Sequence, residues 1–259
     1  MFLGISRRWA LSLLAKAASV PARNPMTQRR ALFPALLAAT AVCFAYLIGF
    51  IFLNTPTAQL AAGGITQKVF YFHVPAAYAM YLSGAVCFAA SAAYLMRATP
   101  TRNAVAHAAA ECAVLFGMMV LTSGPLWARK AWGVYWTWDP RLTTSLLSVL
   151  VYVAVVVLRT FAGEGEAERK FAAALGVLGT VNLPIIHYSV RKWGGNHPAV
   201  ISKGGGGLGH PDMYHALTVG FVAMTLLAIV LIWHRSALTI QKARLAAAEE
   251  AALSRGIEI

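Results

Sequence analysis

Six long apolar runs limit the folds that this chain can adopt. Each approaches or exceeds the roughly 20 apolar residues that a helix needs to cross the hydrocarbon core of a bilayer. Only 12% of the residues are charged, whereas soluble domains have about 25%. The runs do not alternate with a period of two, as the strands of a membrane barrel would. We therefore predict an all-α membrane protein with six spans, over Ala31–Leu53, Val74–Met96, about Ala104–Leu126, Leu142–Leu158, Phe171–Val190 and Met213–Trp233.

The basic residues predict the orientation of these spans. The chain has a formal net charge of +13, and its Lys and Arg residues are distributed unequally between the two sides of the predicted bundle. Fifteen lie on the side of the termini and seven on the opposite side. Because cytoplasmic loops are enriched in Lys and Arg, both termini are predicted to be cytoplasmic. The positive charge then reflects topology and gives no support to nucleic-acid binding.

Charge and hydropathy divide the chain into three parts. Residues 1–30 contain no acidic side chain, since the first one is Glu111. They are predicted to form a basic extension, either a membrane-surface helix or a presequence, with Met26 as a second possible start. Residues 31–236 are the predicted six-helix membrane domain. Residues 237–259 are predicted to be a cytoplasmic tail that continues the last span as a helix.

One outward-facing segment is unusually rich in tryptophan. The predicted topology exposes residues 54–73, 127–141 and 191–212 on the outward side, and the second segment has four tryptophans within twelve residues. An aromatic belt is one interpretation, because Trp favours the headgroup region. A belt spreads over both interfaces, however, so a platform for a flat apolar ligand is favoured. The four residues are Trp127, Trp132, Trp136 and Trp138.

Two charged residues close this segment. Asp139 followed by Pro140 is typical of a helix start, with Asp as the N-cap and Pro in the first helical position. Capping and ligand binding are both open for Asp139. Arg141 can form paired hydrogen bonds with a carboxylate and is a candidate to bind an acidic group of the ligand, as are Arg129 and Lys130.

Histidines on two different outward segments flank the tryptophans. His73 ends the first segment, and His197 lies in the third. Neutral imidazole is a common metal ligand, and a haem iron takes one or two axial donors. A flat, apolar, charged and metal-bearing ligand would be a haem. His187 and His210 are the alternatives if His197 is not a ligand.

Three segments resemble one known family. WGVYWTWDPRLT (132–143) resembles the tryptophan-rich WWD signature of haem-handling proteins in cytochrome c maturation. FYFHVPAAY (70–78) and VNLPIIHYSV (181–190) are similar to the flanking segments of CcmC, the haem exporter protein C family. The similarity runs from about Gln67 to His197 in the family's order, and the family also has six spans.

The resemblance implies a specific function. Haem b would be bound on the periplasmic face of the bacterial inner membrane, with His73 and His197 as the two axial ligands to iron. Trp127, Trp132, Trp136, Trp138 and Asp139 match the platform motif. The family presents its haem to the chaperone CcmE, which binds it covalently. CcmA and CcmB, an ATP-driven pair, then help to release the loaded chaperone, and CcmD is a small bridging subunit.

Two other classes of function remain open from the residues. A haem-containing electron-transfer subunit would hold haem between helices, and a permease would conduct haem along intramembrane polar residues, here His107, Glu111 and Asn182. His107 and Glu111 are four residues apart and are predicted to pair with each other. The chain has no motif of hydrolytic chemistry and no ATP site, so it is not predicted to be a classical enzyme.

Overall fold

Helices make up all the regular structure in the described part of the chain. The computed structural model describes residues 25–58, 63–161, 165–197 and 208–254. Six helical segments are long and apolar enough to cross a membrane, so the predicted all-α fold with six spans is confirmed. The elements are α2 (Pro25–Leu53), the 3-10 helix η2 (Gly64–Val69), α3 (Phe70–Met96), α4 (Pro100–Trp132), α5 (Pro140–Phe161), α6 (Glu166–Thr180), α7 (Asn182–Trp193) and α8 (Pro211–Leu253).

The chain divides into two compact units, residues 1–38 and residues 39–259. In the first unit, residues 25–38 are the start of α2, and this helix therefore begins before the predicted span. The predicted basic extension lies outside the described residues as far as residue 24, as do residues 255–259 of the predicted tail. The second unit contains the rest of α2, all the other helices of the described residues and the site described below.

Several helices extend beyond the apolar runs that predicted them. α3 begins at Phe70 and contains Pro75, so the predicted start at Val74 was wrong and His73 is the fourth residue of the helix. α4 continues to Trp132, where Gly133 ends it with a φ of 77°, a left-handed conformation that glycine adopts readily. The predicted outward loop 127–141 is therefore helical over residues 127–132 and again from Pro140, and the non-helical part is residues 133–139. Hydropathy marks the part of a helix that lies in hydrocarbon, whereas capping residues mark its end.

The predicted fifth span consists of two helices, α6 and α7, which meet at Val181. Pro184 has no N–H to donate to the carbonyl of Thr180, and this interrupts the helical hydrogen bonding. At the break, the Asn182 side-chain amide donates to Thr144 O and to Ser148 Oγ on α5, both at 2.7 Å. Asn182 therefore fastens α7 to α5.

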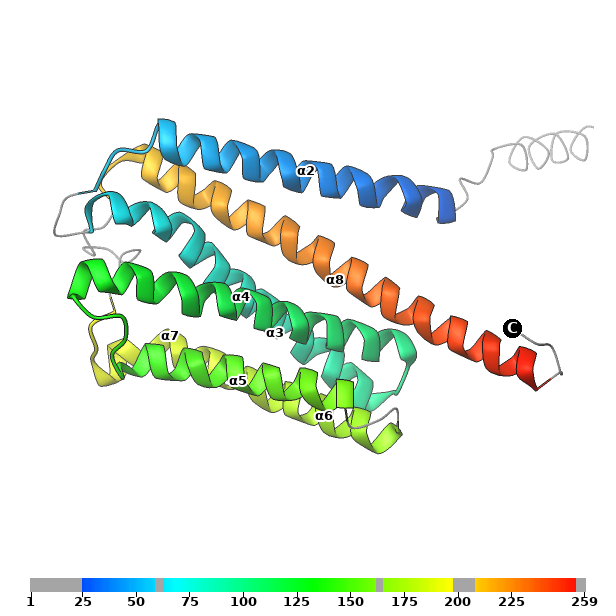
Figure 1. The fold of residues 1–259 in the computed structure, drawn as a ribbon. Coiled ribbons are helices and arrows are strands. Elements are labelled where there is room, and N and C mark those ends of the chain that lie inside the picture. The colour runs from blue at the N-terminus through cyan, green and yellow to red at the C-terminus, as the bar shows by residue number, and fades with distance from the viewer. Residues whose placement is uncertain (1–24, 59–62, 162–164, 198–207, 255–259) are drawn as a thin grey trace, which may run out of the picture. The chain divides into compact units, whose positions relative to one another are not determined.

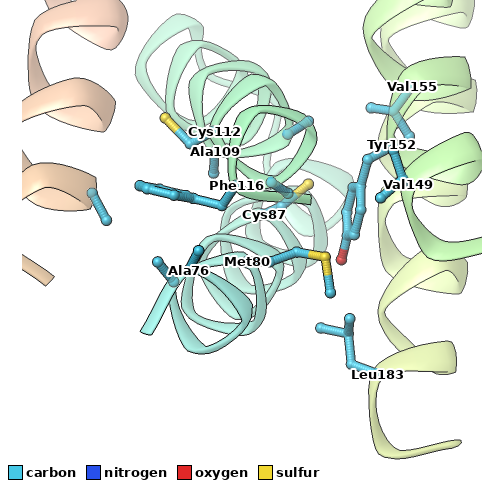
Figure 2. Packing of buried hydrophobic residues seen from close by; sticks show 14 of the residues in the cluster. Ala76, Met80, Cys87, Ala109, Cys112, Phe116, Val149, Tyr152, Val155 and Leu183 are labelled. Atoms are coloured by element: carbon cyan, nitrogen blue, oxygen red, sulfur yellow. The ribbon is translucent and has the colours of Figure 1, made fainter. Parts of the chain in front are cut away.

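Small residues let α3 and α4 pack closely in the core of the second unit. α4 contributes Ala109, Ala113 and Phe116 to the main buried cluster. Figure 2 shows Tyr152 of α5 and Leu183 of α7 completing this cluster on one side of Met80. Packing of small side chains is a general means of association between helices in lipid.

Arg235 on α8 and Glu111 on α4 form an ion pair between the two longest helices. The guanidinium Nε and Nη2 donate to the two carboxylate oxygens at 2.5 and 2.7 Å. His107 Nε2 lies 3.5 Å from Glu111 Oε1, so the predicted pair is present but is longer than the contacts with Arg235.

Substitution of Gly220 is expected to destabilise the bundle. A Cβ at this position of α8 would lie 2.8 Å from the Tyr71 carbonyl oxygen and 2.8 Å from Pro75 Cγ on α3. Neither atom belongs to a flexible side chain, so Gly220→Ala should lower the free energy of unfolding by about 1–3 kcal/mol. Thermal unfolding in detergent measures this. Gly49→Ala is the control, since no atom lies within 4 Å of its Cβ, and a midpoint for Gly220→Ala equal to that of the control would contradict the prediction.

Candidate ligand-binding cavity

One end of the second unit contains a cavity. The beginnings of α3, α5 and α8 and the ends of α4 and α7 gather at this end (Figure 1). Residues from all five helices, together with Val69, Trp136 and His197, line a cavity of about 510 Å³, which is within the roughly 300–1,000 Å³ of small-molecule sites. Its wall combines aliphatic side chains with side chains that carry polar atoms, namely His73, Tyr78, Tyr81, Trp127, Trp132, Trp136, Arg141, Ser145, His187, Arg191 and His197.

α4 fixes the ring of His73 on the cavity wall. The Ser123 hydroxyl donates to the Met119 carbonyl at 2.6 Å, and Ser123 Oγ is 2.8 Å from His73 Nδ1. Because the hydroxyl has one proton to donate, it accepts from Nδ1–H, and Nε2 keeps its lone pair. A Cβ at Gly124 would lie 3.2 Å from His73 Cε1, so the glycine gives the ring its space. This tautomer suits a metal ligand that coordinates through Nε2.

Asp139 links the start of α5 to the loop that carries His197. Its Oδ1 accepts from Arg141 N at 2.8 Å and from Leu142 N at 3.3 Å, which confirms the predicted helix cap. Its Oδ2 accepts from His197 N at 3.2 Å. At Gly195, with a φ of 141°, a Cβ would collide with this carboxylate. Asp139 is buried and is not among the residues that line the cavity.

The tryptophans fall into two edge-to-face pairs. Trp127 and Trp132, on the last turns of α4, have ring centroids 5.5 Å apart, and both line the cavity. Trp136 and Trp138, in the loop that follows, are 5.9 Å apart. Trp136 lines the cavity, whereas Trp138 is 76% exposed and lies outside its lining. The buried Trp136 Nε1–H has no acceptor among the described residues.

Of the three basic candidates for an acidic group, only Arg141 lines the cavity. Its Nη1 lies 3.1 Å from His197 Nδ1, its Nη2 donates to the His187 carbonyl at 3.0 Å, and no described residue accepts from its buried Nε. Arg129 instead donates to the Gly133 carbonyl and lies over the ring of Tyr135. Lys130 is exposed.

The structure thus brings together most of the side chains that the sequence singled out. His73, His197, three tryptophans and Arg141 share the cavity, while Trp138 and Asp139 lie outside its lining. His187, the first alternative ligand, also lines it, and His210 does not. Sequence reasoning missed Tyr81 and Ser123. Helical periodicity could have identified Tyr81, because it lies about two turns after His73 on the same helix. No local signal in the sequence relates Ser123 to a residue 50 positions earlier.

These residues suit a haem in chemical terms. The wall is mainly apolar and aromatic, which matches a porphyrin face, and two imidazoles from different elements can approach an iron. The buried N–H groups of Trp136 and Arg141 without described acceptors can donate to carboxylates.

Fold and cavity together define a multi-pass helical membrane protein with a histidine-bearing aromatic site at one end of its bundle. A family model described as "Heme exporter protein C" matches residues 14–251. The chain belongs to this family, CcmC.

Individual relatives agree with this assignment. The chain is 35% identical over 169 residues to a "Heme exporter protein C" of Bradyrhizobium diazoefficiens, covering 65% of this chain and 64% of the relative. It is 35% identical over 135 residues to the Escherichia coli protein of the same description, covering 52% of this chain and 55% of the relative. A mitochondrial protein of Marchantia polymorpha, described as ccmC-like and assigned to cytochrome c biosynthesis, is 30% identical over 143 residues, which are 55% of this chain and 60% of that protein. The matches therefore span less than two thirds of these relatives.

Proposed function

We propose that this protein binds haem b in the cavity and presents it to the chaperone CcmE for covalent attachment during the biogenesis of c-type cytochromes. His73 and His197 are the axial ligands to the iron. The observation that carries the proposal is that one cavity contains both histidines, three of the four clustered tryptophans and Arg141. The names of the relatives, which refer to haem export and cytochrome c biosynthesis, support it.

Each group in the wall has a role in this proposal. His73 Nε2 is held ready to coordinate iron by the hydrogen bond of Nδ1 to Ser123. Trp127, Trp132 and Trp136 form the platform that orients the porphyrin edge. Arg141 pairs with a haem propionate. The task of the chain in this proposal is to position haem for the histidine of the chaperone.

The proposal also includes the membrane in which the protein lies, its orientation there and its partner proteins. The excess of basic residues near the termini supports a cytoplasmic location for both ends, with the cavity at the periplasmic face of the bacterial inner membrane. CcmA, CcmB and CcmD are the other partners, carried over from the family.

The permease alternative receives less support from the same contacts. Two of the three intramembrane polar residues on which it rests, Glu111 and Asn182, bind side chains or carbonyl groups of neighbouring helices. Glu111 also lies near the third, His107. The polarity of Glu111 and Asn182 is thereby accounted for by helix packing, whereas the buried Nε2 of His107 has no hydrogen-bond partner among the described residues.

Transfer of haem to the apo-chaperone tests the proposal and its electron-transfer alternative. The full chain is purified from membranes, its absorption spectrum is recorded, and purified apo-CcmE is added. We expect haem in the purified protein and its appearance, covalently bound, on the chaperone in a denaturing gel. Haem that stays with the protein would favour the electron-transfer subunit, and a protein that neither carries nor binds haem would contradict the proposal.

The substitution Trp136→Phe is expected to weaken haem binding while it leaves the stability of the folded protein nearly unchanged. Phenylalanine keeps most of the aromatic contact and removes an N–H that no described residue accepts. The free energy of unfolding should therefore change by less than about 0.5 kcal/mol, while haem affinity falls about 3- to 10-fold through loss of a donor to a carboxylate. Thermal unfolding and haem titration measure the two effects. Trp138→Phe, outside the cavity, is the control, and equal haem affinities of the two variants would contradict the role of Trp136.

A further inference from the structure

Arg141 and Ser123 fix His197 and His73, two of the three histidines that line the cavity, in opposite tautomers. A guanidinium has only donors, so Nη1 of Arg141, 3.1 Å from His197 Nδ1, donates to that nitrogen. A neutral imidazole that accepts at Nδ1 carries its proton at Nε2. In His73 the proton is at Nδ1, because Ser123 accepts from it.

The hydrogen bond from Arg141 and iron ligation by His197 exclude each other. Ligation through Nε2 requires the ring proton to move to Nδ1, which can then no longer accept from Nη1. Ligation through Nδ1 uses the lone pair that Nη1 now occupies. The imidazole stays neutral in both cases, so only the position of its proton and its partner change. Iron ligation by His197 therefore releases the Nη1–H of Arg141 by either route.

We propose that Arg141 is a positioning residue that exchanges His197 for a carboxylate of the bound haem, an inference that rests on the proposed function. The Nη2 contact with the His187 carbonyl, 3.0 Å long, is retained and acts as a pivot. The released Nη1–H is the donor for the carboxylate, while the buried Nε–H, which no described residue binds, lies on the opposite edge of the guanidinium and can serve a second acceptor. Propionate binding and ligation by His197 are thereby coupled, because each favours the same position of the guanidinium.

The dimethyl ester of haem, in which both carboxylates are blocked, tests whether Arg141 exchanges His197 for a haem carboxylate. Ferric haem and its dimethyl ester are titrated separately into the purified full-length protein in detergent, and the low-spin absorption bands report two-histidine ligation. In the wild type, the ester leaves Arg141 on His197 and should give a smaller low-spin fraction than free haem. In Arg141→Ala this competition is gone, so the variant should bind the ester in the low-spin form about 10-fold more tightly than the wild type does.

This outcome differs from that of a simple contact between Arg141 and a propionate, for which the variant and the wild type would bind the ester equally. Arg191→Ala is the matched control, because Arg191 lines the cavity, carries the same charge and has no described hydrogen bond to His197. The control should show no gain in affinity for the ester. Equal binding of the ester by wild type and Arg141→Ala, or the same gain in Arg191→Ala, would overturn the exchange and leave the proposed function intact. Failure of the wild type to form low-spin free haem would overturn both.

Discussion

Replacing His73 with alanine is expected to abolish the low-spin spectrum of haem bound to the protein and to weaken haem binding by more than about 100-fold. The reason is that His73 lines the cavity and that the hydrogen bond of its Nδ1 to Ser123 leaves the lone pair on Nε2. Haem titration followed by absorption spectroscopy measures both effects.

Two further variants make this prediction specific. Ser123→Ala keeps the imidazole but removes its partner, and should weaken haem binding about 10-fold while the low-spin bands remain. His210→Ala is the matched control, since His210 lies outside the cavity lining and its Nδ1 accepts from the Asp212 amide. A low-spin spectrum in His73→Ala that disappears in His187→Ala would contradict the assignment of His73 as a ligand.

Arg235→Ala is expected to destabilise the bundle strongly. It leaves the Glu111 carboxylate, 24% exposed, without its two strong hydrogen bonds between helices that lie in the membrane. Breaking a fully buried pair costs about 3–5 kcal/mol, and since 38% of the Arg235 side chain is exposed we expect about 2–3 kcal/mol. The midpoint of thermal unfolding in detergent measures this.

The double variant Glu111→Gln/Arg235→Gln should recover most of the lost stability, because two neutral amides can bond to each other and leave no buried charge. Arg244→Ala, on the exposed last turns of α8, is the control for loss of one positive charge. The expected role of the pair would be wrong if Arg235→Ala unfolded at the same temperature as Arg244→Ala.

The sequence predicted the helices well because lipid imposes a simple rule on them. Spanning helices require long apolar runs, and all six runs lie within helical segments of the structure. The ends of the helices were predicted less well. Trp127 and Trp132 were expected in a loop and lie in α4, because amphipathic interfacial residues are compatible with a helix until Gly133 ends it.

The sequence predicted which residues belong to the site, but it did not predict which of them contact one another. Local motifs marked His73, His197 and Arg141, and the cavity contains all three. The hydrogen bond between Arg141 and His197 joins residues 56 positions apart, and the ion pair between Glu111 and Arg235 joins residues 124 apart. Such contacts depend on how helices pack, and a single sequence carries no periodic or local signal for them.

The length of α8 gives it a mechanical property. Its 43 residues form a rod about 65 Å long, about twice the hydrocarbon thickness, and its side chains from Gln241 to Ala251 are exposed. Arg235 pins this rod to α4, about 21 Å from Phe221 on the cavity wall and about 27 Å from Leu253. Because Gly220 also packs closely on Tyr71 and Pro75 of α3, the arm toward Phe221 is held at both of its ends. We therefore expect sideways motion of α8 in the exposed arm beyond Arg235 and not at the cavity.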